Sequence, residues 1–166
     1  MLLLGARTNG STDREVWRAQ RRFCADPDDV LGALTDPATI AEWAPVAFEV
    51  DGLAGGCLEA GSRERVSGSI AGIRTTFEIE VKQADRERLE LVARGPITFD
   101  VAYRFDQRED EVLVQATVGL RRERGFAAQI LRGAAAALLN AHALDSALRR
   151  LESSVACGVE AELIAA

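Results

Sequence analysis

Apolar and polar residues alternate through most of the middle of the chain, which predicts a series of β-strands. In the clearest run, 73–82, Phe77, Ile79 and Val81 alternate with charged neighbours. The same period predicts strands at 15–23, 46–50, 62–70, 73–82, 88–94, 97–105 and 111–120. Short polar turns separate the later strands, so we expect an antiparallel meander with one face toward water.

Two short helices are predicted directly after the first strand, over 27–35 and 37–43. Each starts with an Asp-Pro pair, in which the Asp caps free backbone N–H groups and the Pro suits the first helical position.

A third helix is predicted from Gly125 to Val155, because apolar residues recur there at alternating steps of four and three. These positions are Ile130, Ala134, Ala137, Ala141, Leu144, Leu148, Leu151 and Val155. We expect one uninterrupted helix of about 45 Å that crosses the sheet. Its alanines either allow very close packing or leave a cavity beneath the helix.

The composition is that of one globular domain. The chain has 166 residues, 48% of them apolar and 28% charged. We expect a flexible leader over 1–13, the domain over 14–157 and a tail over 158–166. A net charge of −6 argues against a nucleic-acid partner, and no apolar run reaches the ~18 residues of a membrane span.

The three cysteines, Cys24, Cys57 and Cys157, lack CxxC spacing. They indicate reduced thiols in a cytoplasmic protein and no metal site. The chain also lacks the glycine-rich motifs that bind nucleotides, and no cofactor is expected.

Several stretches match one structural superfamily over about residues 15–155. They are Phe23-Cys24-Ala25-Asp26-Pro27, Leu34-Thr35-Asp36-Pro37, Trp43-Ala44-Pro45, Gly61, Glu80-Val81, Arg88-Leu89, Leu148 and Leu151. In these stretches and in its order of elements the chain resembles START-like proteins, which include Bet v 1-type proteins, polyketide cyclases/dehydrases and lipid-transfer domains. The resemblance implies the α+β helix-grip fold. In this fold a seven-stranded curved antiparallel sheet wraps around a long C-terminal helix, with two short helices after strand 1. A looser likeness, over 67–77, is to carbon-monoxide-dehydrogenase accessory proteins.

The resemblance also implies an internal pocket between the sheet and the long helix, with Trp43 at its opening. The expected lining residues are Phe77, Leu91, Phe99, Val101, Val114, Ala134, Ala137 and Ala141. Such a pocket suits a hydrophobic or aromatic small molecule, such as a polyketide, a lipid or a quinone.

Three polar residues are candidates for chemistry. Arg21 is predicted to face inward, where a guanidinium needs a partner, and Glu64 is the expected one. Arg21 would bind or polarise a ligand carbonyl, or the two would form an ion pair at the rim. Tyr103 would donate a hydrogen bond or act as an acid, or would anchor the core. His142, the only histidine, would be an acid or base at the cavity mouth, or a structural residue.

These residues leave three functions open. The first is polyketide cyclase/dehydrase-like chemistry, in which the pocket folds a reactive chain and Arg21 stabilises the developing oxyanion. The alternative is a non-catalytic carrier or a sequestering self-resistance protein. The third is an interaction protein of a larger enzyme complex. The sequence decides neither turnover nor whether the chain forms a homodimer.

Overall fold

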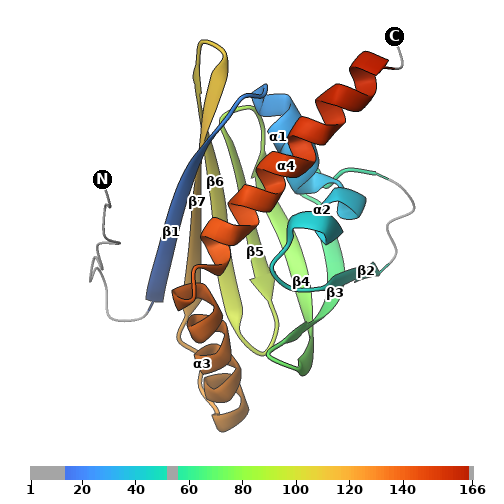
Figure 1. Cartoon of the computed structure of the whole chain (residues 1–166). Helices are drawn as coiled ribbons and strands as arrows, with labels where there is room; N and C mark the ends of the chain where they lie inside the picture. Colours follow the sequence, from blue (N-terminus) through green and yellow to red (C-terminus); the bar gives the residue numbers. More distant parts are fainter. Residues whose placement is uncertain (1–13, 52–55, 165–166) are drawn as a thin grey trace, which may run out of the picture.

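Helices cover one face of a curved antiparallel sheet in the computed structural model, which describes residues 14–51 and 56–164 (Figure 1). The strands are β1 (Arg14–Phe23), β2 (Phe48–Asp51), β3 (Arg63–Ile70), β4 (Ile73–Ala84), β5 (Arg88–Arg94), β6 (Thr98–Arg108) and β7 (Glu111–Arg121). The helices are α1 (Pro27–Thr35), α2 (Pro37–Trp43), α3 (Phe126–Asn140) and α4 (Ala143–Ile164). The expected leader, 1–13, lies outside the described residues.

The seven strands form one sheet in the order β1-β7-β6-β5-β4-β3-β2, and β1 closes the meander by pairing with β7. The register places Tyr103 opposite Leu89 on one side and opposite Ala116 on the other. All three side chains are buried, so they mark the inner face, which the helices cover. The predicted strands and the helix-grip fold are confirmed.

The two short helices begin as their Asp-Pro pairs predict. The Asp26 carboxylate accepts a hydrogen bond from the Asp28 N–H at 2.9 Å, and Asp36 accepts one from the Ala38 N–H at 3.1 Å. Pro27 and Pro37 are the first residues of their helices.

The expectation of one uninterrupted helix over 125–155 is wrong. The helix breaks after Asn140, and His142 takes the left-handed conformation with φ 63°. The Ala141 N–H donates to the carbonyls of Ala137 and Leu138, which closes the last turn of α3. A left-handed residue just after a helix is usually Gly, so a His at this place gives no sequence signal for the break. Beyond it α4 continues to Ile164, so most of the expected tail over 158–166 is helical.

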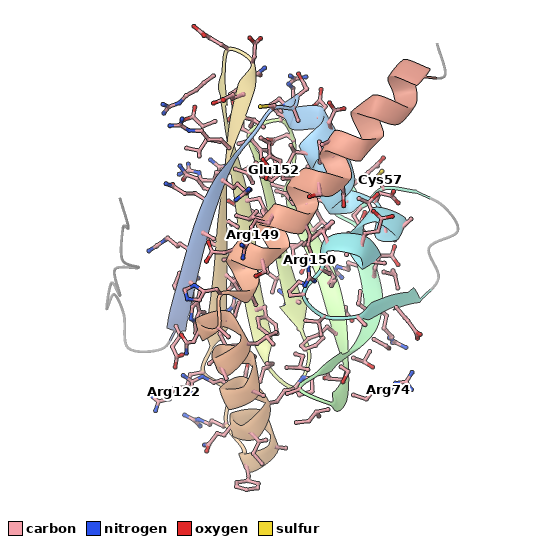
Figure 2. The ribbon with its side chains drawn as sticks, viewed as in Figure 1. Cys57, Arg74, Arg122, Arg149, Arg150 and Glu152 are labelled. Carbon is pink, nitrogen blue, oxygen red and sulfur yellow. The ribbon has the colours of Figure 1, made fainter. Side chains whose placement is uncertain are left out.

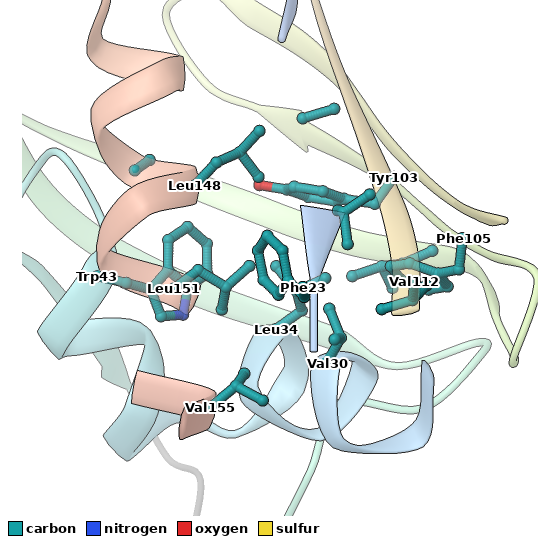
Figure 3. Close-up of a cluster of buried hydrophobic side chains, with 14 of the residues drawn as sticks. Phe23, Val30, Leu34, Trp43, Tyr103, Phe105, Val112, Leu148, Leu151 and Val155 are labelled. Atoms are coloured by element: carbon teal, nitrogen blue, oxygen red, sulfur yellow. The ribbon is translucent and has the colours of Figure 1, made fainter. Parts of the chain in front are cut away.

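Because of this break, α3 and α4 pack on the sheet in two separate hydrophobic clusters. The first cluster joins α1, α2 and α4 to the sheet through residues such as Val30, Leu148 and Leu151 (Figure 3). The second joins α3 to the other end of the sheet and consists of Ile70, Phe77, Ile97, Leu120, Leu131 and Ala135. Trp17 and Phe99 contact both clusters.

The helix break can be tested by comparing two substitutions of one exposed residue. Gly fits a left-handed position better than Ala, but in a helix interior it is about 1 kcal/mol worse. We therefore expect His142→Gly to be more stable than His142→Ala by about 1 kcal/mol. The free energy of unfolding in urea measures this difference. An uninterrupted helix would reverse its sign.

Candidate functional site

A band of apolar side chains between the two clusters is only half-buried, although it lies on the inner face of central strands. We call these residues the inner band: Ile79, Leu91, Ala93, Phe99 and Val101. Ile79 and Leu91 belong to neither cluster. Where helices cover a sheet, the side chains of its central strands on that face are normally buried. The inner band is therefore apolar surface that the helices cover only in part.

Tyr103 adds a polar group next to the inner band. Its side chain is only 6% exposed, and its hydroxyl points toward Leu148 of α4 (Figure 3). Within 14–51 and 56–164 the hydroxyl has no hydrogen-bond partner. Burial raises the pKa of Tyr103 above its usual value of 10.0, so the group stays a neutral phenol that can donate a hydrogen bond.

A second buried hydroxyl without a partner belongs to Thr75, which is 6% exposed. Thr75 lies two residues before Phe77 on the same face of β4. The sequence gives no signal for this residue, because a threonine in an alternating strand does not reveal whether its hydroxyl is paired. A buried polar group without a partner is costly, so these two hydroxyls are places where a ligand atom can bind.

The structure separates Arg21 from Glu64, so the expected ion pair is wrong. Both residues lie at inner-face positions, but four strands (β7, β6, β5 and β4) stand between β1 and β3. Arg21 instead donates through Nε to the Glu152 carboxylate of α4. Glu64 lies opposite Ile79 of the inner band. The Glu64 carboxylate forms no hydrogen bond or ion pair with any residue of the described ranges.

Arg21 and His142, two of the three predicted catalytic residues, line one open hollow of about 300 Å³. The other lining residues are Gln20, Asp145, Leu148 and Arg149. His142 is 82% exposed, with Nδ1 3.5 Å from an Asp145 carboxylate oxygen. Leu148 is 2% exposed and lines this hollow, whereas Tyr103, whose hydroxyl points toward Leu148 (Figure 3), does not line it.

The predicted lining residues fall into three groups. Leu91, Phe99 and Val101 belong to the inner band. Phe77 and Val114 are buried, and the Phe77 ring packs edge-on against Phe99 at 5.7 Å.

The alanines differ from expectation because α3 is rotated about its axis relative to the predicted seam. Its buried residues are Leu131 and Ala135, and Ala134 is half-buried. Ala137 and Ala141 are exposed, so their expected place in a cavity wall is wrong. The expected closed cavity is also not found in the described residues, where the hollow at Arg21 is open and is not lined by the inner band.

Two tryptophans hold the helices around the inner band. The Trp43 indole Nε1 donates to the Ala33 carbonyl at 2.9 Å and ties α2 to α1. The Trp17 indole donates to the Asn140 side chain, also at 2.9 Å, where α3 ends. The polypeptide around the band is therefore fixed by specific hydrogen bonds on both sides.

Within the two described ranges, no group of three His, Cys, Asp or Glu residues could hold a metal ion. The Cys24 and Cys57 thiols are free and exposed. No helix there is both long enough and apolar enough to cross a membrane.

No protein-family model and no curated protein matches this chain. Solved structures do. The chain is similar to the Zhui aromatase/cyclase from Streptomyces sp. R1128, with a TM-score of 0.64 and 16% identity over 88% of this chain and 96% of that one. It is similar to a START superfamily protein from Mycobacterium smegmatis, with a TM-score of 0.60 and 14% identity over 84% and 96%. Ara h 8.0201 matches with a TM-score of 0.56 and 9% identity over 87% and 99%. At identities this low, the structural similarity establishes a shared fold and nothing more.

The two unpartnered hydroxyls predict an unusual response to substitution. Removing a paired buried hydroxyl costs about 1 kcal/mol, whereas removing an unpaired one costs nothing or stabilises. We expect Tyr103→Phe and Thr75→Val to unfold at the same or higher urea concentration than the wild type. Thr35→Val is the matched control, because the buried Thr35 hydroxyl donates to the Leu31 carbonyl at 2.8 Å. A loss of about 1 kcal/mol in all three variants would mean that the hydroxyls are paired within the protein.

Proposed function

Because the chain has a START/Bet v 1-like fold, we propose that it binds a hydrophobic small molecule on the inner face of its sheet. The apolar part of the ligand covers the inner band, and a carbonyl or hydroxyl oxygen accepts a hydrogen bond from Tyr103. The observation that carries this proposal is the Tyr103 hydroxyl, which belongs to a buried side chain and has no hydrogen-bond partner in the described residues, next to apolar side chains that are only half-buried.

Both features favour the same kind of ligand. Covering apolar surface contributes about 25 cal/mol per Å², so a ligand gains affinity from Leu91, Phe99 and Val101 in proportion to the area it covers. The Tyr103 hydroxyl fixes its orientation, because it gains a hydrogen bond when a ligand oxygen reaches it. A ring system or chain with a few ketone or hydroxyl oxygens has this combination.

Carriage without turnover fits the placement of the polar residues. The Tyr103 hydroxyl points toward Leu148, and Tyr103 is not among the residues that line the hollow with Arg21 and His142. A bound oxygen at Tyr103 would therefore have one neutral donor beside it and no adjacent base. That arrangement binds a ligand and leaves it unchanged.

Cyclase/dehydrase-like activity in natural-product biosynthesis is the second candidate. It is favoured by the similarity to the Zhui aromatase/cyclase and by the phenol of Tyr103 beside the inner band. In such a reaction an enol carbon of the bound chain bonds to a carbonyl carbon of the same chain. The carbonyl oxygen takes up a proton to become a hydroxyl, and water is then lost. Tyr103 would polarise that carbonyl, with positioning supplying much of the acceleration.

The binding surface is tested with a fluorescent probe of apolar sites, anilinonaphthalene sulfonate, and by native mass spectrometry of the protein from its own host. We expect Leu91→Glu to weaken probe binding at least tenfold, because it places a charge in the inner band. Leu113→Glu is the matched control, since Leu113 is also half-buried but lies on the outer face of β7. Equal weakening by both variants, or none, would contradict binding at the inner band. A co-purifying molecule from the host preparation would identify the ligand class.

Turnover is tested by incubating a reactive poly-ketone chain with the protein and measuring the products by mass spectrometry. Cyclase-like activity predicts a changed product profile and a loss of mass equal to one water, both reduced at least tenfold by Tyr103→Phe. Arg21→Ala tests whether the hollow takes part, with Leu113→Glu as the control. An unchanged profile beside intact probe binding would exclude this second candidate and leave carriage.

A further inference from the structure

Large apolar side chains are exposed mainly at one end of the molecule, where β7 leads into α3 and β3 turns into β4. Phe126, the first residue of α3, is 80% exposed, and Ile130, one helical turn later, is 49% exposed. Ile73, at the β3–β4 turn, is 41% exposed. In Figure 1 the beginning of α3 extends beyond the sheet at the lower end of the view. We call Ile73, Phe126 and Ile130, with Arg74, Arg122 and Arg124, the tip surface.

The tip surface is basic on a chain whose net charge is −6. The three connecting segments at this end, 69–74, 94–98 and 121–125, contain five arginines and one glutamate. Arg122 and Arg124 are exposed, and neither has a hydrogen-bond or ion-pair partner in the part of the chain that the structure describes. Arg74 reaches only Glu49, at 4.0 Å, and both side chains are more than 80% exposed. Figure 2 shows Arg74 and Arg122 on opposite sides of this end.

The apolar part of the tip surface extends along the outward side of α3, beyond the arginines that precede the helix. Phe126, Ile130, Gly133 and Ala137 follow one another at steps of four, three and four, so they share one side of the helix. All four are exposed and none is charged. The buried residues Leu131 and Ala135 face the sheet from the other side. A helix that is apolar on its solvent-facing side as well as on its packed side exposes apolar surface, and such surface often marks an interaction site.

We propose that the tip surface docks on an anionic phospholipid membrane, with Phe126 and Ile130 inserted among the lipids and Arg122, Arg124 and Arg74 at the headgroups. The charge complementarity favours an anionic surface, since Arg74, Arg122 and Arg124 are exposed at this end of an acidic protein, and Arg122 and Arg124 have no ion-pair partner in the described residues. The shape favours lipid over a protein partner, because the apolar residues protrude at a helix start and a tight turn. This role goes beyond ligand binding and does not depend on it.

The test is flotation of the full chain with phosphatidylcholine vesicles that contain or lack phosphatidylglycerol. We expect binding only to the anionic vesicles and weaker binding as salt rises, since salt screens the arginines. Arg122→Glu/Arg124→Glu is expected to lower the vesicle affinity at least tenfold. Phe126→Ser/Ile130→Ser is expected to lower it similarly at low salt. Both residue pairs are exposed, so the variants keep the fold, which circular dichroism and thermal unfolding confirm.

The matched control is Arg22→Glu/Arg104→Glu, which makes the same change in net charge. These arginines are also exposed and form no hydrogen bond or ion pair with a described residue, but they lie on strands away from the tip surface. We expect less than a twofold effect from them. Absence of binding to anionic vesicles at low salt, or an equal loss in both arginine variants, would overturn the proposal. Self-association of the free protein that Phe126→Ser/Ile130→Ser abolishes would also overturn it, by assigning the tip surface to a second copy. Sedimentation velocity measures that outcome.

Discussion

One helix is too narrow to cover the inner face of a seven-stranded sheet, and this constraint shapes the rest of the structure. Strands lie about 4.8 Å apart, so the sheet is about 29 Å wide, whereas a helix with its side chains is about 10 Å across. The chain meets the constraint with four helices in the described ranges, of which α1, α2 and α4 cover one end and α3 the other. The inner band is the apolar surface left between them.

The break at His142 allows α3 and α4 to pack on different parts of the sheet. It lets α3 turn toward the second cluster while α4 stays on the first, and it releases Asn140 to bind the Trp17 indole at the boundary. It also rotates α3, so that Leu131 and Ala135 face the sheet and Ala137 faces away. The same rotation exposes Phe126 and Ile130. The half-buried inner band and the apolar tip surface are therefore two consequences of one backbone feature.

The polar groups divide between these surfaces according to what surrounds them. Arg21 is satisfied by Glu152 at the edge of the sheet, and it lies with the exposed His142 in an open hollow. Tyr103 and Thr75 are buried residues whose hydroxyls have no partner in the described residues, and Tyr103 lies beside the inner band. Buried unpaired hydroxyls are rare because of their cost, which is why they point to a ligand more strongly than the charged residues of the hollow do.

The sequence by itself determined the strands, their inner and outer faces and the two capped helices, because these depend on periodicity and on neighbours within a few residues. It also determined that Arg21 and Tyr103 face inward. Only the tertiary structure decided which groups pair across long separations. Arg21 and Glu152 are 131 positions apart, and no local pattern records that contact. The helix break, too, was decided by the tertiary structure, since the apolar period continues across His142 and by itself predicts one helix.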